Sequence, residues 1–183
     1  MTRTILSFTL LPVFAASLLT PACATMQDSQ GVAFLQTAAQ ENLAQIALGQ
    51  LAIQMAESPQ VKQFGEKMVQ DHQMANQAIR QLATKERVNL PKQLNENQQV
   101  KHYELSQLSG KPFDLAYMQY MLEDHKKDVN EFEHTAQRLQ DENVQRWAFN
   151  ALPILRQHLV LASTVATSLG PTYLFSRETH THR

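Results

Sequence analysis

The sequence predicts an all-α protein in which four long helices form a bundle. Only five glycines occur among the 183 residues, and no run alternates Val, Ile, Thr and aromatic residues as strands require. Ala, Gln and Leu are frequent, and all three favour helices. Four segments also place their apolar residues at alternating spacings of four and three, the pattern of a helix with one buried face.

Residues 1–24 are predicted to be an export signal that is removed from the mature protein. Arg3 gives the positive start, residues 5–19 are apolar, and the small residues before position 25 suit cleavage after Ala24. Cleavage there removes the only cysteine, so the mature chain has no disulfide and depends on packing for its stability. We expect a soluble periplasmic protein. The alternative is an outer-membrane lipoprotein anchored at Cys23.

The formal net charge is −1, which gives no field strong enough to recruit nucleic acid or an anionic membrane. The apolar start is also shorter than the ~20 residues of a membrane span, and no later segment resembles one. We therefore expect neither a nucleic-acid partner nor a transmembrane segment in the mature chain.

The first two long helices are predicted over residues 31–56 and 59–87, after a linker over residues 25–30. Ser58 followed by Pro59 ends the first helix and starts the second, because serine caps helices and proline suits the first helical position. So short a connection requires an antiparallel hairpin.

The other two long helices are predicted over residues 112–140 and from the polar corner at Asp141 to residue 169. Between the two hairpins lies the one long connection, with a short helix over residues 96–108. Its length allows either a crossover along the bundle or a simple excursion. The domain thus spans residues 31–169, and residues 170–183 are predicted to be a disordered tail.

Each long helix carries one polar residue on the stripe that should face the core. These residues are Glu41, His72, His125 and His158. Glu41 lies 17 residues before Ser58 and His72 lies 14 after it, whereas His125 and His158 lie 16 before and 17 after Asp141. At a rise of ~1.5 Å per residue, the members of each pair differ in height by only about 4.5 Å and about 1.5 Å. If the two hairpins are in register, all four meet at mid-bundle.

Four converging polar groups need either each other or an ion, because an unbonded buried polar group costs about 1–3 kcal/mol. Imidazole and carboxylate together suit one transition-metal ion such as zinc, copper, iron or nickel. We therefore predict a metal site formed by Glu41, His72, His125 and His158. The alternative is that Glu41 bonds one imidazole, the others bond backbone or water, and the network only fixes the register of the helices.

Two aspartates directly precede seam histidines, in the related stretches MVQDH and MLEDH. Asp71 and Asp124 should flank the seam, where each could orient a ligating imidazole on a neighbouring helix. The alternative is that both are solvated surface acids. Glu131 and His134 have the Glu-x-x-His spacing of di-iron bundles, but neither falls on the seam, so we expect no site there.

The ordered stretches FGEKMVQDHQMANQAIRQLA, GKPFDLAYMQYMLEDHKKDVNEFEHTA and ALPILRQHLVLA resemble the bacterial domain-of-unknown-function family 4142. The resemblance covers residues 31–169 and implies an exported protein with a ferritin-like bundle, often labelled as an outer membrane protein, with no established reaction. The residues that match are Glu41, Asp71, His72, Phe113, Asp114, Tyr117, His125, Phe132, Glu133, Pro153 and His158. Di-iron ferritin relatives supply several core carboxylates, whereas this chain offers one, which argues against oxidase or iron-storage activity.

Together these observations predict a ferritin-like four-helix bundle with a short extra helix between the second and third long helices. The leading functional hypothesis is binding of one transition metal in an envelope storage, buffering or stress role. The alternative is a metal-free structural or interaction bundle of the periplasm or outer membrane. An enzyme that uses an open metal position ranks last, because the sequence shows no separate nucleophile or acid–base pair.

Overall fold

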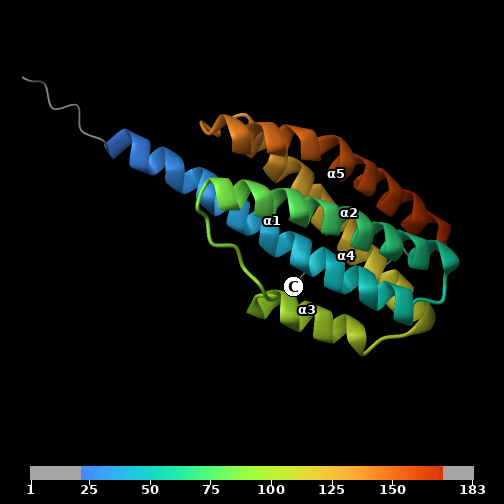
Figure 1. Ribbon diagram of the computed structural model, residues 1–183. Coiled ribbons are helices and arrows are strands. Elements are labelled where there is room, and N and C mark those ends of the chain that lie inside the picture. The colour runs from blue at the N-terminus through green and yellow to red at the C-terminus, as the bar shows by residue number, and fades with distance from the viewer. Residues whose placement is uncertain (1–21, 171–183) are drawn as a thin grey trace, which may run out of the picture.

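The computed structural model describes residues 22–170, and within them the chain forms five helices and no strand (Figure 1). The predicted all-α bundle is therefore confirmed. The helices are α1 (Ala22–Met55), α2 (Pro59–Lys85), α3 (Glu96–Ser106), α4 (Gly110–Ala136) and α5 (Glu142–Ser168). None of these helices is both long and apolar enough to cross a membrane.

Helix α1 begins earlier than predicted. Residues 25–30 were expected to form a linker, but they belong to the first turns of α1, which starts at Ala22. No glycine or proline interrupts the chain between Ala22 and Gln30, so nothing in this stretch breaks the helix. The rest of the predicted signal peptide, residues 1–21, and the predicted tail over residues 171–183 lie outside the described residues.

Two antiparallel hairpins, α1–α2 and α4–α5, form the bundle. Pro59 occupies the start of α2 as predicted, but the Ser58 side chain makes no capping hydrogen bond. Instead, Asp114 at the start of α4 accepts hydrogen bonds from the backbone amides of Glu57, at 3.1 Å, and Ser58, at 2.8 Å. At the other hairpin, Asp141 accepts from the amides of the first turn of α5 and caps that helix.

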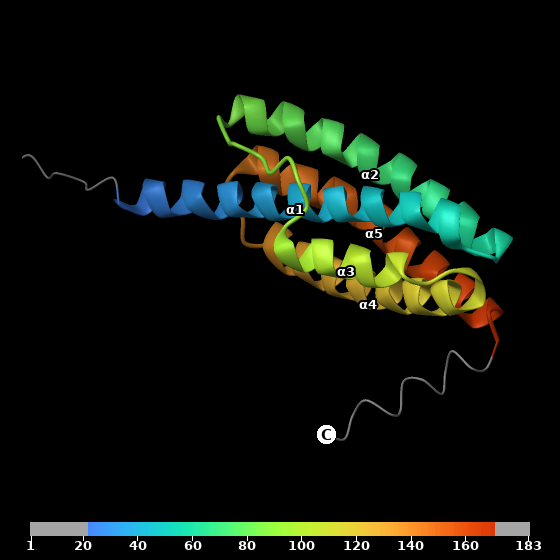
Figure 2. The same ribbon diagram turned by 90° about the horizontal axis from the view of Figure 1, so that it is seen from below.

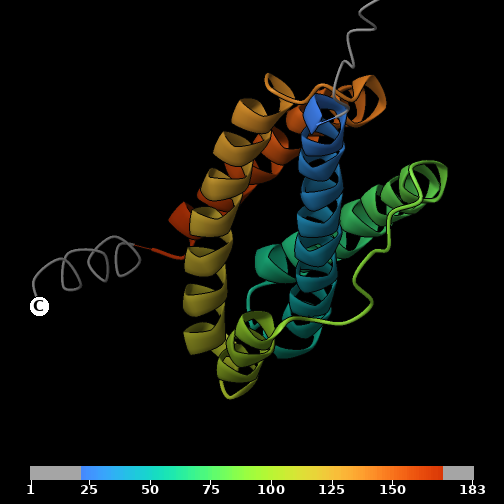
Figure 3. The same ribbon diagram turned by 90° about the vertical axis from the view of Figure 1, so that its left-hand side faces the viewer.

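The long connection crosses the whole length of the bundle. Helix α2 ends beside the start of α5, where Asn143 bonds the side chain of Glu86 at 3.2 Å. Helix α4 starts at the opposite end, where Asp114 binds the α1–α2 turn. The chain therefore returns along the outside of the bundle before α4 begins, as Figure 3 shows, and α3 packs beside α1 and α4 (Figure 2). This crossover is the connection that ferritin-like bundles use.

The apolar core is divided into two parts by a polar layer. One cluster lies toward the α1–α2 turn and includes Phe64, Met68 and Tyr117. The other lies toward the α4–α5 turn and includes Leu35, Ile79 and Ala148. Between them, at mid-height, the buried polar side chains are Asn42, Gln45, His72, Asn76, His125, Asp128 and His158. This layer contains the site.

Candidate metal centre

Three histidines from three different helices meet in the polar layer. His72 on α2, His125 on α4 and His158 on α5 are 5%, 0% and 1% exposed. Their ring centroids are 5.3–6.1 Å apart. One ring nitrogen of each lies within 4.8 Å of those of the other two. We call these three residues the histidine cluster.

Each ring of the histidine cluster has one nitrogen bonded to an oxygen acceptor on its outer side. His72 Nδ1 lies 2.7 Å from Asn42 Oδ1, and His125 Nδ1 lies 2.9 Å from the carbonyl of Met121. His158 Nε2 lies 2.7 Å from Asp71 Oδ2. Since the acceptors are oxygens, these nitrogens carry the protons, and the tautomer of each neutral ring is fixed.

The other nitrogen of each ring is a buried acceptor without a partner among the described residues. These atoms are His72 Nε2, His125 Nε2 and His158 Nδ1. In neutral rings whose outer nitrogens are protonated, each of them carries a free lone pair. Nitrogens bound to one ion at about 2.0–2.1 Å lie closer together than the 4.8 Å that bounds these separations, so binding would draw the rings inward. The donor set suits a transition metal.

Burial keeps the histidines neutral. It is the main cause that holds the pKa of His72 well below its usual value, with the charges of His125 and His158 adding to the effect. Burial and the neighbouring His158 lower the pKa of His125 to about 4, although the Met121 carbonyl opposes this. Burial also lowers the pKa of His158, against the opposing effect of Asp71. The lone pairs are therefore available near neutral pH without loss of a proton.

The comparison with family models decides the family. The model of a domain of unknown function, DUF4142, matches residues 16–165. The chain belongs to the DUF4142 family. Among curated proteins, no sequence matches it.

The fold of this DUF4142 protein is also found in a solved structure. It is similar to the crystal structure of a DUF305 protein from Streptomyces coelicolor that is described as secreted, with a TM-score of 0.63 and 12% identity. The match covers 79% of this chain and 92% of the other. At this identity the likeness concerns the fold alone.

Several residues that carry the family resemblance have structural roles outside the histidine cluster. Phe113 stacks on Tyr117 with centroids 5.4 Å apart, and Asp114 binds the α1–α2 turn. Phe132 packs against Phe34 and Trp147 in the second apolar cluster. Glu133 pairs with Arg156 at 2.7 Å between α4 and α5, and Pro153 lies within a continuous α5.

Asp71 lies where it can orient a histidine of another helix. Its carboxylate accepts from His158 Nε2 and pairs with Lys67 at 2.8 Å. Burial alone would raise the pKa of Asp71, but the hydrogen bonds from Lys67 and His158 and their charges outweigh it and lower the pKa. Asp71 is therefore a carboxylate, and a carboxylate behind a ligating imidazole raises its basicity.

Glu41 and Asp124, which were predicted to take part in the site, lie in a different group. Glu41 is half-buried and lies 3.5 Å from Gln98 of α3, and it is not part of the histidine cluster. Asp124 accepts a hydrogen bond from Gln45 at 2.6 Å and makes no recorded bond to a histidine. With Asp128 they form what we call the acidic cluster: besides burial, the charge of Glu41 raises the pKa of Asp124, and the charges of Asp124 and Glu41 raise the pKa of Asp128.

The rotation of α1 explains why Glu41 is displaced. Neighbouring residues on a helix point about 100° apart, and it is Asn42, 6% exposed, that faces His72. Asn42 was not predicted as a site residue. The signal that could have found it is the second apolar row of this helix, in which Leu35 and Ala39 precede Asn42 by seven and three residues.

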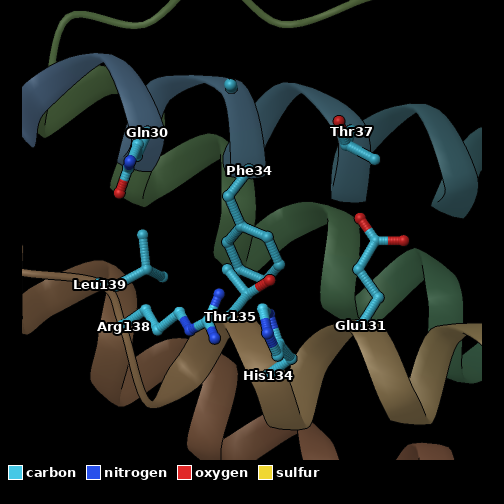
Figure 4. Close-up of a pocket in the computed structure, with 9 residues that line it drawn as sticks. Gln30, Phe34, Thr37, Glu131, His134, Thr135, Arg138 and Leu139 are labelled. Atoms are coloured by element: carbon cyan, nitrogen blue, oxygen red, sulfur yellow. The ribbon is translucent and has the colours of Figure 1, made fainter. Parts of the chain in front are cut away.

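The bundle has two hollows in very different settings, and only one of them touches the histidine cluster. A cavity of about 410 Å³ adjoins His72 and His158. A second hollow, of about 350 Å³, lies between α1 and α4, where Glu131 and the exposed His134 line it beside Phe34 (Figure 4). The Glu-x-x-His pair therefore lies outside the histidine cluster.

Proposed function

We propose that this DUF4142 protein binds one transition-metal ion through His72, His125 and His158. The observation that carries the proposal is the set of three inward nitrogens, all buried and all without a hydrogen-bond partner in the described part of the chain. Three imidazoles suit zinc, copper, iron or nickel, and three protein ligands leave a further coordination position open.

The sequence predicts four ligands, and we now propose three of them, because of the position of Glu41. The Glu41 carboxylate accepts from Gln98 and belongs to the acidic cluster, so we do not include it in the ligand set. Asp71 and Asn42 hold the rings of His158 and His72 and would set their orientation toward an ion. Asp124 accepts a hydrogen bond from Gln45 and none of the three rings bonds to it, so we do not assign it a role in orienting a ligand.

We further infer that the ion serves a storage, buffering or stress role in the cell envelope. The basic, apolar and small-residue pattern of residues 1–24 supports export, and so does the likeness to a protein described as secreted. The periplasm is the proposed compartment, with lipid attachment at Cys23 as the alternative. Mass spectrometry of the mature N-terminus distinguishes a chain cleaved after residue 24 from a chain acylated at Cys23.

Metal analysis tests the proposal directly. Protein purified without a histidine tag and loaded with zinc or copper should retain one ion per chain after dialysis. His72→Ala and His158→Ala should lose the ion, whereas the matched control His134→Ala, at an exposed position, should retain it. A wild-type protein that stays metal-free, with an unchanged melting temperature after zinc or copper is added, would contradict the proposal.

That contrary result would favour a metal-free structural bundle. The observation behind this second candidate is that the outer hydrogen bonds already join helices: Asn42 to His72 joins α1 to α2, and Asp71 to His158 joins α2 to α5. In that case His72→Ala would lower the free energy of unfolding, with or without metal in the buffer.

A further inference from the structure

The cavity beside the histidine cluster has a closed inner end and an open mouth. His72 and His158 line it and are almost fully buried, so they mark the inner end. Met74 and Ile154 also line it and are 54% and 46% exposed, so they mark the mouth. The cavity therefore connects the surface between α2 and α5 with the two histidines.

The lining selects for an uncharged and mainly apolar molecule. Phe132, Trp147, Ile154 and Leu155 supply aromatic and branched aliphatic surface. No lysine or arginine among the described residues lines the cavity, so this lining offers no charged group that would hold an anion. Its one carboxylate, Asp71, is already bonded to Lys67 and His158 and is not free to bind a cation. The volume of about 410 Å³ is that of a small-molecule site.

The polar atoms at the inner end add a requirement for a donor atom. His72 and His158 each contribute an unpartnered nitrogen to the histidine cluster, and both residues line the cavity. Because these two histidines belong both to the cluster and to the lining, an ion held by the cluster would lie next to the inner end of the cavity.

We propose that this cavity binds a small uncharged molecule with an aromatic or branched aliphatic body, and that a nitrogen or sulfur donor on that molecule completes the coordination of the metal. The donor part of the inference rests on the proposed metal site, whereas the apolar part does not. The single tryptophan of the chain, Trp147, lines the cavity and reports on its occupancy.

The apolar part is tested with N-phenyl-1-naphthylamine, an uncharged fluorescent probe, on metal-free protein. We expect the probe to bind, gain fluorescence and change the emission of Trp147. Ala151→Phe, which fills the cavity, should weaken binding by about tenfold or more. Val160→Phe, an exposed position on the same helix outside the cavity, is the matched control and should bind as the wild type does.

A second variant guards against a folding defect in Ala151→Phe. Ile154→Lys places a charge at the mouth without filling the interior, so it should also weaken the probe while circular dichroism stays helical. Equal probe binding in the wild type, Ala151→Phe and Ile154→Lys would overturn the assignment of the cavity, as would an absence of binding to the wild type.

The donor part is tested with 4-phenylimidazole on protein loaded with cobalt(II), a spectroscopic substitute for zinc. We expect its visible spectrum to change on addition of 4-phenylimidazole and to stay unchanged with biphenyl, which has no donor atom. If cobalt binds but 4-phenylimidazole leaves the spectrum unchanged, this inference fails while the proposed metal site stands. If cobalt does not bind although N-phenyl-1-naphthylamine does, the metal site fails and the cavity remains an apolar site without metal.

Discussion

The histidine cluster and the acidic cluster lie at the same level of the bundle, yet burial affects them in opposite ways. It lowers the pKa values of the histidines, which leaves neutral rings with free lone pairs. In the acidic cluster, burial and mutual repulsion raise the pKa of Asp124 to about 6 and that of Asp128 to about 8. Burial thus leaves the histidine cluster with neutral rings that can bind a cation, and it keeps protons on the acidic cluster at higher pH.

The partners of the two clusters differ as well. Each histidine has an outer acceptor that fixes its tautomer, whereas the inner nitrogens face one another without partners. In the acidic cluster, Gln45 donates to Asp124, and Lys127 partly offsets the repulsion at Asp124 and Asp128. Convergence of free acceptors is therefore what distinguishes a candidate site from a merely buried polar group.

The largest expected effect is on metal affinity when a histidine is removed. His125→Ala leaves two imidazoles in place of three, so we expect metal affinity to fall by about 10³-fold or more. Asp124→Ala in the acidic cluster should change affinity by less than about tenfold, since the three rings bond to other acceptors and not to Asp124. Competition titrations with a chromophoric chelator measure both. Equal losses of affinity in the two variants would contradict the claim that the histidine cluster, and not the acidic cluster, binds the metal.

A smaller loss is expected when the carboxylate behind His158 is neutralised. Asp71→Asn keeps the size of the side chain but removes the charge that supports the ring, so metal affinity should fall by about 10–100-fold. The same chelator titration applies, with Glu133→Gln as the control, because Glu133 pairs only with Arg156. Wild-type affinity in Asp71→Asn would show that this carboxylate does not tune the site.

The acidic cluster should make the protein less stable as the pH rises. Asp128 has a raised pKa in the folded state, so its contribution is fully present below the ordinary value of 3.8 and is lost as the pH rises through about 8. Asp128→Asn removes this loss and should raise the free energy of unfolding by about 1–3 kcal/mol near pH 9. Urea denaturation of both proteins at acid and alkaline pH measures the effect. A variant that is less stable than the wild type at alkaline pH would contradict it.

The histidine cluster should have the opposite pH dependence. The pKa of His125 is lowered from 6.5 to about 4, so its contribution is fully present above pH 6.5 and is lost as the pH falls toward 4. Between pH 4 and 6.5 this gain with rising pH opposes the loss from Asp128, so the histidine contribution is measured as the difference in stability between metal-free wild type and His125→Ala. Thermal melting of both proteins across this pH range checks the prediction, and the difference should fall as the pH falls from 6.5 to 4. A difference that does not fall would show that the ring is not held neutral.

A loss of stability is also expected when Asn42 is replaced. Asn42→Ala removes the acceptor of His72 Nδ1 and should lower the free energy of unfolding by about 1–3 kcal/mol at neutral pH, because the ring then has a buried unpaired donor. Gln36→Ala, which removes only an exposed bond to the carbonyl of Asn89, is the control. If the two substitutions lower the free energy of unfolding equally, the hydrogen bond to His72 contributes no more to stability than an exposed one.

The sequence predicts the helices and the height of the polar residues within each hairpin, because apolar spacing and hairpin length determine both. Counting residues from each turn places Glu41 level with His72 and His125 level with His158, but the register of the two hairpins that brings His72 to the other two rings does not follow from the count. The rotation of α1 is harder to predict: its apolar stripe is broad, so Glu41 and Asn42 were both compatible with the core. The earlier start of α1 follows from the lack of a helix breaker.

Other features depend on tertiary packing that spacing does not encode. The direction of the connection between α2 and α4 is fixed by the contact of Asp114 with the α1–α2 turn. The cavity exists because small residues such as Ala75, Ala78 and Ala151 leave space between α2 and α5. Neither could be read from one helix alone, because each arises only where two helices face each other.

X-ray absorption spectroscopy of the zinc- or copper-loaded, untagged protein tests the central claim most directly. The histidine cluster predicts an ion bonded to three imidazole nitrogens at about 2.0–2.1 Å, with the multiple scattering typical of imidazole rings. The His134→Ala control should give the same spectrum. A shell of oxygen ligands without imidazole scattering would contradict the proposed site.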